Sequence, residues 1–99
     1  MEQIGLLARI EAKPEHADEV RKLLEGALEL ARQETGTVTW FAFRTGPASF
    51  GVFDTFDDEA GRTAHLNGEI AAALMAIAPT LLATAPDIQK TDILAAKLP

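Results

Sequence analysis

Every aromatic side chain in this 99-residue chain lies within residues 40–56. They are the single tryptophan and the five phenylalanines: Trp40, Phe41, Phe43, Phe50, Phe53 and Phe56. A half-buried strand alternates apolar with polar side chains, yet Trp40 and Phe41 are neighbours and both are large. This stretch therefore predicts strands that carry large apolar groups on both faces.

Two strands are predicted in this region, at residues 38–45 and 50–56, with a turn at residues 46–48 between them. On the first strand, Trp40 and Ala42 oppose Phe41 and Phe43. On the second strand, one face holds Phe50, Val52, Asp54 and Phe56, and the other holds Gly51, Phe53 and Thr55. Asp54 is thus a carboxylate set among apolar neighbours.

The flanking segments predict two further strands and two helical regions. Period-two alternation predicts a strand at residues 3–12, and a three- and four-residue spacing of apolar groups predicts a helix from Pro14 to a stop at Gly36. Asp57 is the predicted N-cap of a helix over residues 57–66. After an interruption at 67–68, residues 69–78 predict a nearly all-apolar helix that is buried on most sides, and residues 87–96 a final strand.

This order of elements predicts one α+β domain spanning residues 1–99, with a ferredoxin-like split βαβ fold and a four-stranded antiparallel sheet. The two predicted helical regions can cover only one face of such a sheet. The aromatic groups on the other face would form an apolar patch larger than monomers usually expose. We therefore expect a homodimer that packs sheet on sheet, the alternative being a C-terminal segment that folds back over that face.

Composition narrows the classes of partner. The formal net charge is −6 and the nine basic residues are scattered, which argues against nucleic acid and against anionic membrane surfaces. The longest apolar run, residues 70–78, is too short to span a bilayer. The absence of cysteine and an N-terminus unlike a signal peptide fit a cytoplasmic protein.

The sequence resembles the antibiotic biosynthesis monooxygenase family, whose members form dimeric α+β barrels. The resemblance covers nearly the whole chain and rests on ARIEAKPEHADEV (8–20), GTVTWFAF (36–43) and FGVFDTFDDEAGRTAHLNGEI (50–70) in this order. Asp54 stands where the family often has Glu, Phe56 where it commonly has Trp, and His65 at the position of a helical His. Glu69 stands where many members carry a second His, which argues against a mechanism that needs two imidazoles.

The resemblance implies a small monooxygenase that uses neither metal nor flavin and oxidises a phenolic or quinol-type aromatic substrate with O₂. Such chemistry needs a dry pocket, a base and a donor for developing negative charge. The implied catalytic residues are His65, whose ordinary pKa suits a base at neutral pH, and Asp54, which orients His65 or acts as the base itself. The expected pocket walls are Phe50, Val52 and Phe56, facing Leu66, Ile70 and Leu74.

Other interpretations stay open at this stage. The same barrel could serve a non-enzymatic protein that binds or senses an apolar small molecule. Haem binding is a third possibility, although the positions matching the Asn and Trp of haem-degrading relatives hold Leu7 and Phe56. In purely structural terms, Asp54 would pair with Arg9 or Arg44, and His65 would be a histidine stabilised by a helix C-terminus. His16 lies among acidic residues at a helix start and is expected to be solvated, and no spacing indicates a metal site.

Overall fold

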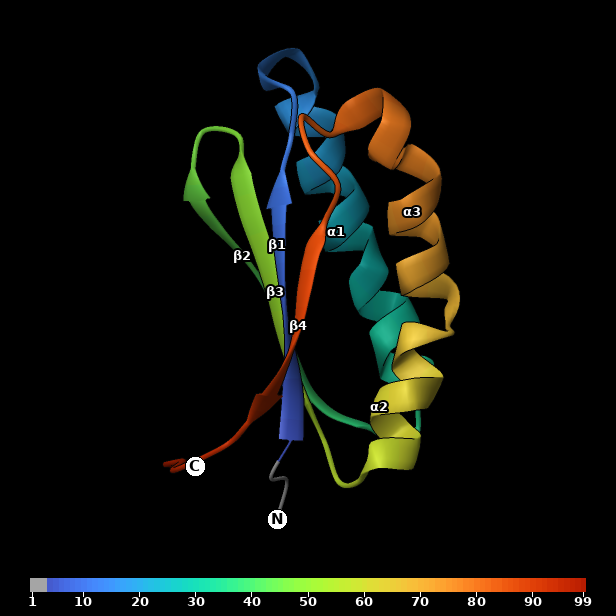
Figure 1. Ribbon diagram of the computed structural model, residues 1–99, viewed down its shortest axis with the longest axis vertical. Helices are drawn as coiled ribbons and strands as arrows, with labels where there is room; N and C mark the ends of the chain where they lie inside the picture. Colours follow the sequence, from blue (N-terminus) through green and yellow to red (C-terminus); the bar gives the residue numbers. More distant parts are fainter. Residues whose placement is uncertain (1–3) are drawn as a thin grey trace.

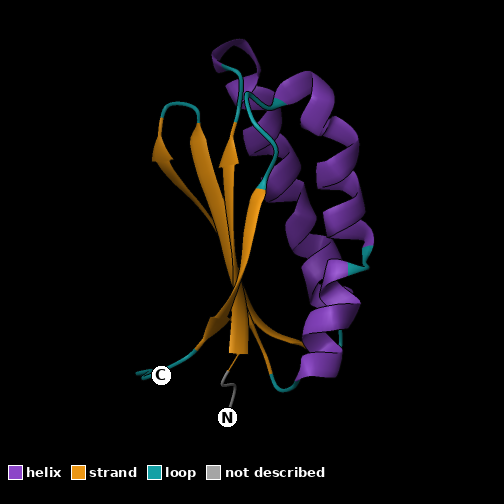
Figure 2. Cartoon of the chain, viewed as in Figure 1, coloured by secondary structure: helices purple, strands orange, loops and turns teal. Residues whose placement is uncertain are grey.

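The computed structural model describes residues 4–99 and has the predicted split βαβ order. Its elements are β1 (Ile4–Glu11), the 3₁₀ helix η1 (Pro14–His16), α1 (Ala17–Gln33), β2 (Thr37–Gly46), β3 (Ser49–Phe56), α2 (Glu59–Leu66), α3 (Glu69–Leu81) and β4 (Asp87–Asp92). The four strands form one antiparallel sheet in the order β2-β3-β1-β4. All helices lie on one face of it (Figures 1 and 2). The α+β ferredoxin-like prediction is confirmed.

The first strand and helix form where the hydrophobic pattern predicts them. β1 points Leu6 and Ile10 into the core, and residue 3 of the predicted strand lies outside the described residues. In α1, the apolar stripe buries Val20 and Leu24 against the sheet, while Leu28 at its margin is 38% exposed. Each fully buried Leu or Val side chain contributes about 1.5–3 kcal/mol, so this stripe fixes α1 against the sheet.

The cap of α2 differs by one residue from the prediction. The N-cap is Asp58, whose Oδ1 accepts a hydrogen bond from the backbone N–H of Gly61 at 2.9 Å. Asp57 is exposed and precedes the cap. The N-cap side chain must reach the amide two or three positions into the helix, and with α2 starting at Glu59 only Asp58 meets that requirement.

The second part of this helical region is less buried than its composition predicts. α3 runs through Pro79 to Leu81, and its buried residues are Ile70 and Leu74. Met75, on the opposite side, is 54% exposed. The prediction of burial on most sides is wrong because α3 lies in the outer layer and has the sheet and α1 on one side only (Figure 1). No helix within residues 4–99 is both long and apolar enough to cross a membrane.

The core lies between the sheet and the helices. Its largest fully buried apolar side chains are Phe56, Ile10 and Val20, each 0% exposed. Trp40 packs against this core from β2. The predicted alternation along β2 and β3 therefore sends Trp40, Phe50 and Phe56 toward the helices.

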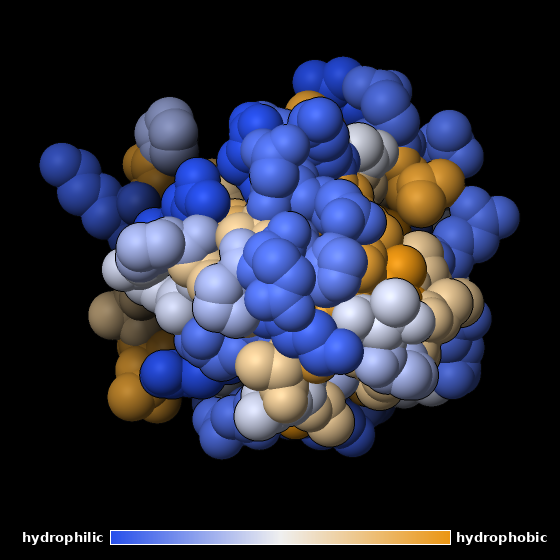
Figure 3. All heavy atoms as spheres, turned by 90° about the horizontal axis from the view of Figure 1, so that it is seen from above, coloured by the Kyte–Doolittle hydropathy of each residue, from blue (hydrophilic) through white to orange (hydrophobic). Residues whose placement is uncertain are grey.

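The opposite side of the sheet, which we call the outer face, carries Phe41 and Phe43 uncovered. Their exposed fractions are 59% and 39%. The predicted final strand ends early, at Asp92, and the following segment runs away from the sheet (Figure 1), with Leu94 95% exposed. The C-terminal segment thus does not fold back over the outer face. Viewed from the end that carries the β2–β3 turn, the surface is mostly hydrophilic, with hydrophobic side chains toward its sides (Figure 3).

Candidate active site

A carboxylate lies in the middle of the sheet's inner face. Asp54 is in β3, directly opposite Leu6 of β1 and Trp40 of β2, and it is 1% exposed. An ionised carboxylate at such depth is costly unless a cation or hydrogen-bond donor compensates it. The position therefore requires a partner from the helix layer above.

The partner is His65, in the last turn of α2. Its Nε2 lies 2.8 Å from Asp54 Oδ2, and the residue is 8% exposed. Within residues 4–99, neither Asp54 oxygen accepts a well-directed hydrogen bond. The contact with His65 is a short ion pair. The imidazole also packs on Phe56, with ring centroids 5.4 Å apart. Asp54 and His65, which the sequence analysis assigned to one site, are thus in contact in the structure. The alternative prediction, that Asp54 pairs with Arg9 or Arg44, is wrong.

A third residue, absent from the sequence-based site, completes this arrangement. Glu34 follows the last residue of α1, and its Oε1 lies 2.6 Å from Nδ1 of His65. The same oxygen accepts a hydrogen bond from Thr37 Oγ1 at 2.8 Å. We call Glu34, His65 and Asp54 the acid–histidine cluster. His65 is held between two carboxylates, one at each ring nitrogen.

Two glycines allow α2 to approach the end of α1 this closely. A Cβ built on Gly36 would lie 2.8 Å from the Cα of Gly61, and one built on Gly61 would lie 2.8 Å from the carbonyl oxygen of Gly36. Real Cβ atoms do not make backbone contacts this short. Gly36, which the sequence suggested only as a helix stop, therefore also allows the contact between Glu34 and His65.

The surroundings of His65 act on its pKa in opposite directions. Burial favours the neutral ring, but the contacts with Asp54 and Glu34 outweigh burial and raise the pKa of His65 from 6.5 to about 9. At neutral pH the ring is therefore an imidazolium that carries protons on both nitrogens. A protonated ring cannot accept a further proton, which favours Asp54 over His65 as the base in the function proposed below.

An apolar cavity of about 40 Å³, which we call the inner cavity, adjoins Asp54 and His65. Its walls come from the sheet and all three α-helices: Leu6, Ala8, Ile10, Leu23, Leu24, Val52, Asp54, His65, Leu66, Ile70, Ala71, Leu74 and Ile88. Of the expected walls, Val52, Leu66, Ile70 and Leu74 line it, and Phe50 and Phe56 do not. Phe50 lies farther along β3 toward the hairpin, and Phe56 contacts the ring of His65 beyond the cavity.

The acid–histidine cluster does not converge on a single point. Glu34 and Asp54 contact the two different nitrogens of one imidazole ring, so their oxygens and a ring nitrogen cannot surround one ion. Within residues 4–99, no group of three or more His, Asp or Glu side chains has the geometry to hold a metal ion. The arrangement is suited to holding charge and exchanging protons.

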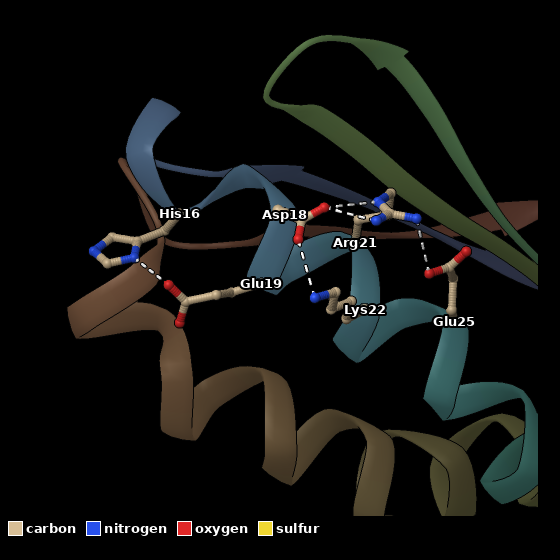
Figure 4. Close-up of polar contacts among 6 residues, drawn as sticks. All are labelled: His16, Asp18, Glu19, Arg21, Lys22 and Glu25. Carbon is tan, nitrogen blue, oxygen red and sulfur yellow. Dashed lines mark hydrogen bonds and ion pairs between the residues drawn. The ribbon is translucent and has the colours of Figure 1, made fainter.

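The other histidine lies at the start of α1, in a surface network of charged groups (Figure 4). Nδ1 of His16 contacts Glu19 at 2.7 Å, and Arg21 bridges Asp18 and Glu25. These pairs lie at the surface, where solvent screens the attraction between the charges, so they add little to stability. The network supports the first turns of α1, and none of its residues lines the inner cavity.

The fold and the site together define a small α+β domain whose helix layer closes a buried acid–histidine pair over an apolar cavity. The profile of the antibiotic biosynthesis monooxygenase family matches residues 3–76, and the chain belongs to this family. Family membership gives it a general monooxygenase-like role. No protein with a curated function matches the chain.

Several solved structures have the same fold as this chain. A protein of unknown function from Nitrosomonas europaea is 56% identical, with a TM-score of 0.96 over 100% of this chain and 96% of that one. A protein from Pseudomonas aeruginosa is 23% identical, with a TM-score of 0.82 over 96% and 97% of the two chains. A structure described as an antibiotic biosynthesis monooxygenase is 21% identical, with a TM-score of 0.80 over 93% and 99%.

Proposed function

We propose that this chain is a cofactor-independent monooxygenase that oxidises a phenolic or quinol-type aromatic substrate with O₂. The observation that carries the proposal is Asp54 Oδ1, a buried carboxylate oxygen without a hydrogen-bond partner, on a residue that lines an apolar cavity. Such an oxygen is an acceptor for a hydroxyl proton, and apolar walls suit an aromatic ring. In this proposal Asp54 is the catalytic base.

His65 has a different role from the base. Its positive charge next to Asp54 compensates the negative charge that remains in the cavity when a substrate hydroxyl is deprotonated. Fixed charges in a dry site act strongly because no water screens them. His65 therefore stabilises the phenolate, while Asp54 holds the proton that was removed.

The oxidation balances without an external reductant. For a substrate of the anthrone type, the deprotonated ring gives electrons to O₂ and a carbon–oxygen bond forms. A ring CH₂ becomes a carbonyl, one oxygen atom stays in the product, and the other leaves as water with the two hydrogens. The proton on Asp54 is returned in forming that water. The chain's contribution is to bind, deprotonate and keep out bulk solvent.

The inner cavity must expand to admit such a substrate. Its volume is about 40 Å³, whereas an engineered protein cavity that binds benzene measures about 150 Å³. α3 supplies one wall and is anchored by only two buried side chains, Ile70 and Leu74. We place the substrate entrance at this helix, because its displacement opens the cavity and leaves the sheet intact.

The proposal includes a homodimer formed through the outer face, acting in the cytoplasm. Phe41 and Phe43 form an exposed apolar patch on the outer face, and a second copy would bury the same patch on both subunits around a two-fold axis. The absence of cysteine fits a reducing compartment.

Oxygen consumption over a panel of anthrones and quinols tests the reaction. We expect turnover with at least one class and loss of turnover in Asp54→Asn. Asp57→Asn, which changes an exposed carboxylate just past the end of β3, is the matched control and should keep full activity. A compound that raises the melting temperature without consuming oxygen would favour the binding-protein interpretation, and a Soret band with added haemin would favour haem.

A further inference from the structure

We propose that Glu34 is the proton port of this site: it holds His65 in the charged form and connects its Nδ1 proton with surface water, by a route separate from the inner cavity. The use of that charge rests on the proposed function, in which His65 stabilises a substrate anion. The route itself rests on geometry alone.

Two separate hollows meet at the acid–histidine cluster. The inner cavity contacts Asp54 and His65 from the core side. A second, surface hollow of about 240 Å³ lies between the end of α1 and the α2–α3 junction, and its lining residues are Leu30, Gln33, Glu34, Ala64, Gly68 and Glu69. The two hollows share no lining residue, and the contact between Glu34 and His65 is the link between them.

The two oxygens of Glu34 have different surroundings. Oε1 is occupied by His65 and Thr37. Oε2 lies toward Gly68, where a Cβ would come within 3.2 Å of it, and it accepts no hydrogen bond from residues 4–99. The side chain is 21% exposed, against 1% for Asp54. Glu34 therefore has one oxygen on the buried histidine and one available to water in the surface hollow.

This asymmetry decides which proton of His65 exchanges. The Nδ1 proton passes to the carboxylate of Glu34 and then to a water in the hollow, which becomes hydronium. A neutral imidazole remains, with its proton on Nε2 beside the fully buried Asp54. The reverse steps recharge the ring, and no electron moves. The charge of His65 can therefore follow the bulk pH while an apolar substrate fills the inner cavity.

Two carboxylates contact His65 and favour its charged form. Asp54 faces it from β3 and Glu34 from the end of α1. Glu69 of α3 lines the surface hollow and forms no ion pair with the ring within the described residues. Arg62, one turn earlier in α2, is engaged by Glu59 and by backbone carbonyls. Removing the charge of Glu34 should therefore lower the pKa of His65 much more than removing that of Glu69.

NMR of the imidazole nitrogens in the intact protein tests this without any substrate. We expect the wild type to titrate near pH 9, and Glu34→Gln to titrate lower by about one pH unit or more, a tenfold change in the acid dissociation constant. Glu69→Gln should shift the midpoint by less than about 0.3 unit, because an exposed charge without contact is screened. In the wild type, the Nδ1 proton should exchange with solvent faster than the Nε2 proton.

The outcomes separate the port from the proposed function. An unchanged midpoint in Glu34→Gln, or faster exchange at Nε2 than at Nδ1, overturns the port even if oxygen is consumed. If Glu34→Gln does not fold, the exchange rates of the wild type decide alone. Absence of turnover refutes the proposed function and leaves the NMR result standing. Where turnover is found, Glu34→Gln should move the alkaline limb of the pH–rate profile to lower pH by the shift that NMR measures.

Discussion

The charge of buried His65 should be visible as a pH-dependent part of the protein's stability. The folded-state pKa of about 9 lies above the ordinary value of 6.5. Because the folded state binds the proton more tightly, the stabilisation is fully present below pH 6.5 and is lost as the pH rises through about 9. The difference between the two values corresponds to about 3 kcal/mol at full effect. Since Glu34 is partly solvated, we expect about 2–3 kcal/mol.

The measurement is the free energy of unfolding in urea at a series of pH values from 6 to 10, for the wild type and His65→Gln. Tyrosine and cysteine, which also ionise near this window, are absent from the sequence, so the comparison concerns only the remaining ionisable groups outside position 65. These groups are common to both proteins and cancel in the difference. A fixed protein concentration removes any contribution from association.

The stability difference between the wild type and His65→Gln should shrink by about 2–3 kcal/mol between pH 6 and pH 10. His16→Gln, which changes the half-buried histidine outside the cluster, is the control for the loss of a histidine as such. A flat difference for His65→Gln would refute the reasoning, because the folded and unfolded states would then bind the proton equally. A difference that grows with pH would show that the native ring is neutral.

Three further changes test the packing around this site. Gly61→Ala forces a methyl group against the backbone of Gly36, so the free energy of unfolding in urea should fall by about 1–3 kcal/mol. The pH midpoint of the His65 titration should fall as well. A fully stable variant would contradict the close approach of the two backbones. Phe41→Glu places a charge on the outer face, and sedimentation should show at least about a tenfold weaker dimer, whereas Met75→Glu on α3 should leave it unchanged. Arg62→Met leaves two backbone carbonyls without their guanidinium donor, which should cost about 2 kcal/mol by the same denaturation assay.

Hydrophobic periodicity predicted most of the fold because each element buries one side, and the spacing of its apolar residues identifies that side. β1 and α1 formed where the pattern placed them, and the turn at Asn67–Gly68 separates α2 from α3. The apolar composition of α3 led to a wrong prediction. The segment was expected to be surrounded by other elements, but many of its residues are alanines, whose exposure to solvent costs little. How many sides of a helix are covered depends on the layers around it, and local sequence does not contain that information.

The acid–histidine cluster shows the same division between local and tertiary information. Asp54 and His65 could be associated from the sequence because the family resemblance assigns both to the site, with Asp54 on an apolar strand face and His65 on the helix that follows. Glu34 was missed because 31 positions separate it from His65, and as one of several glutamates at a helix end it has no distinguishing pattern. Only the split βαβ topology, together with the close approach of Gly36, which follows α1, to Gly61 of α2, turns it into a partner. A glutamate two residues before a glycine, just past the end of a helix that meets a histidine-bearing helix, is the signal to look for in a related chain.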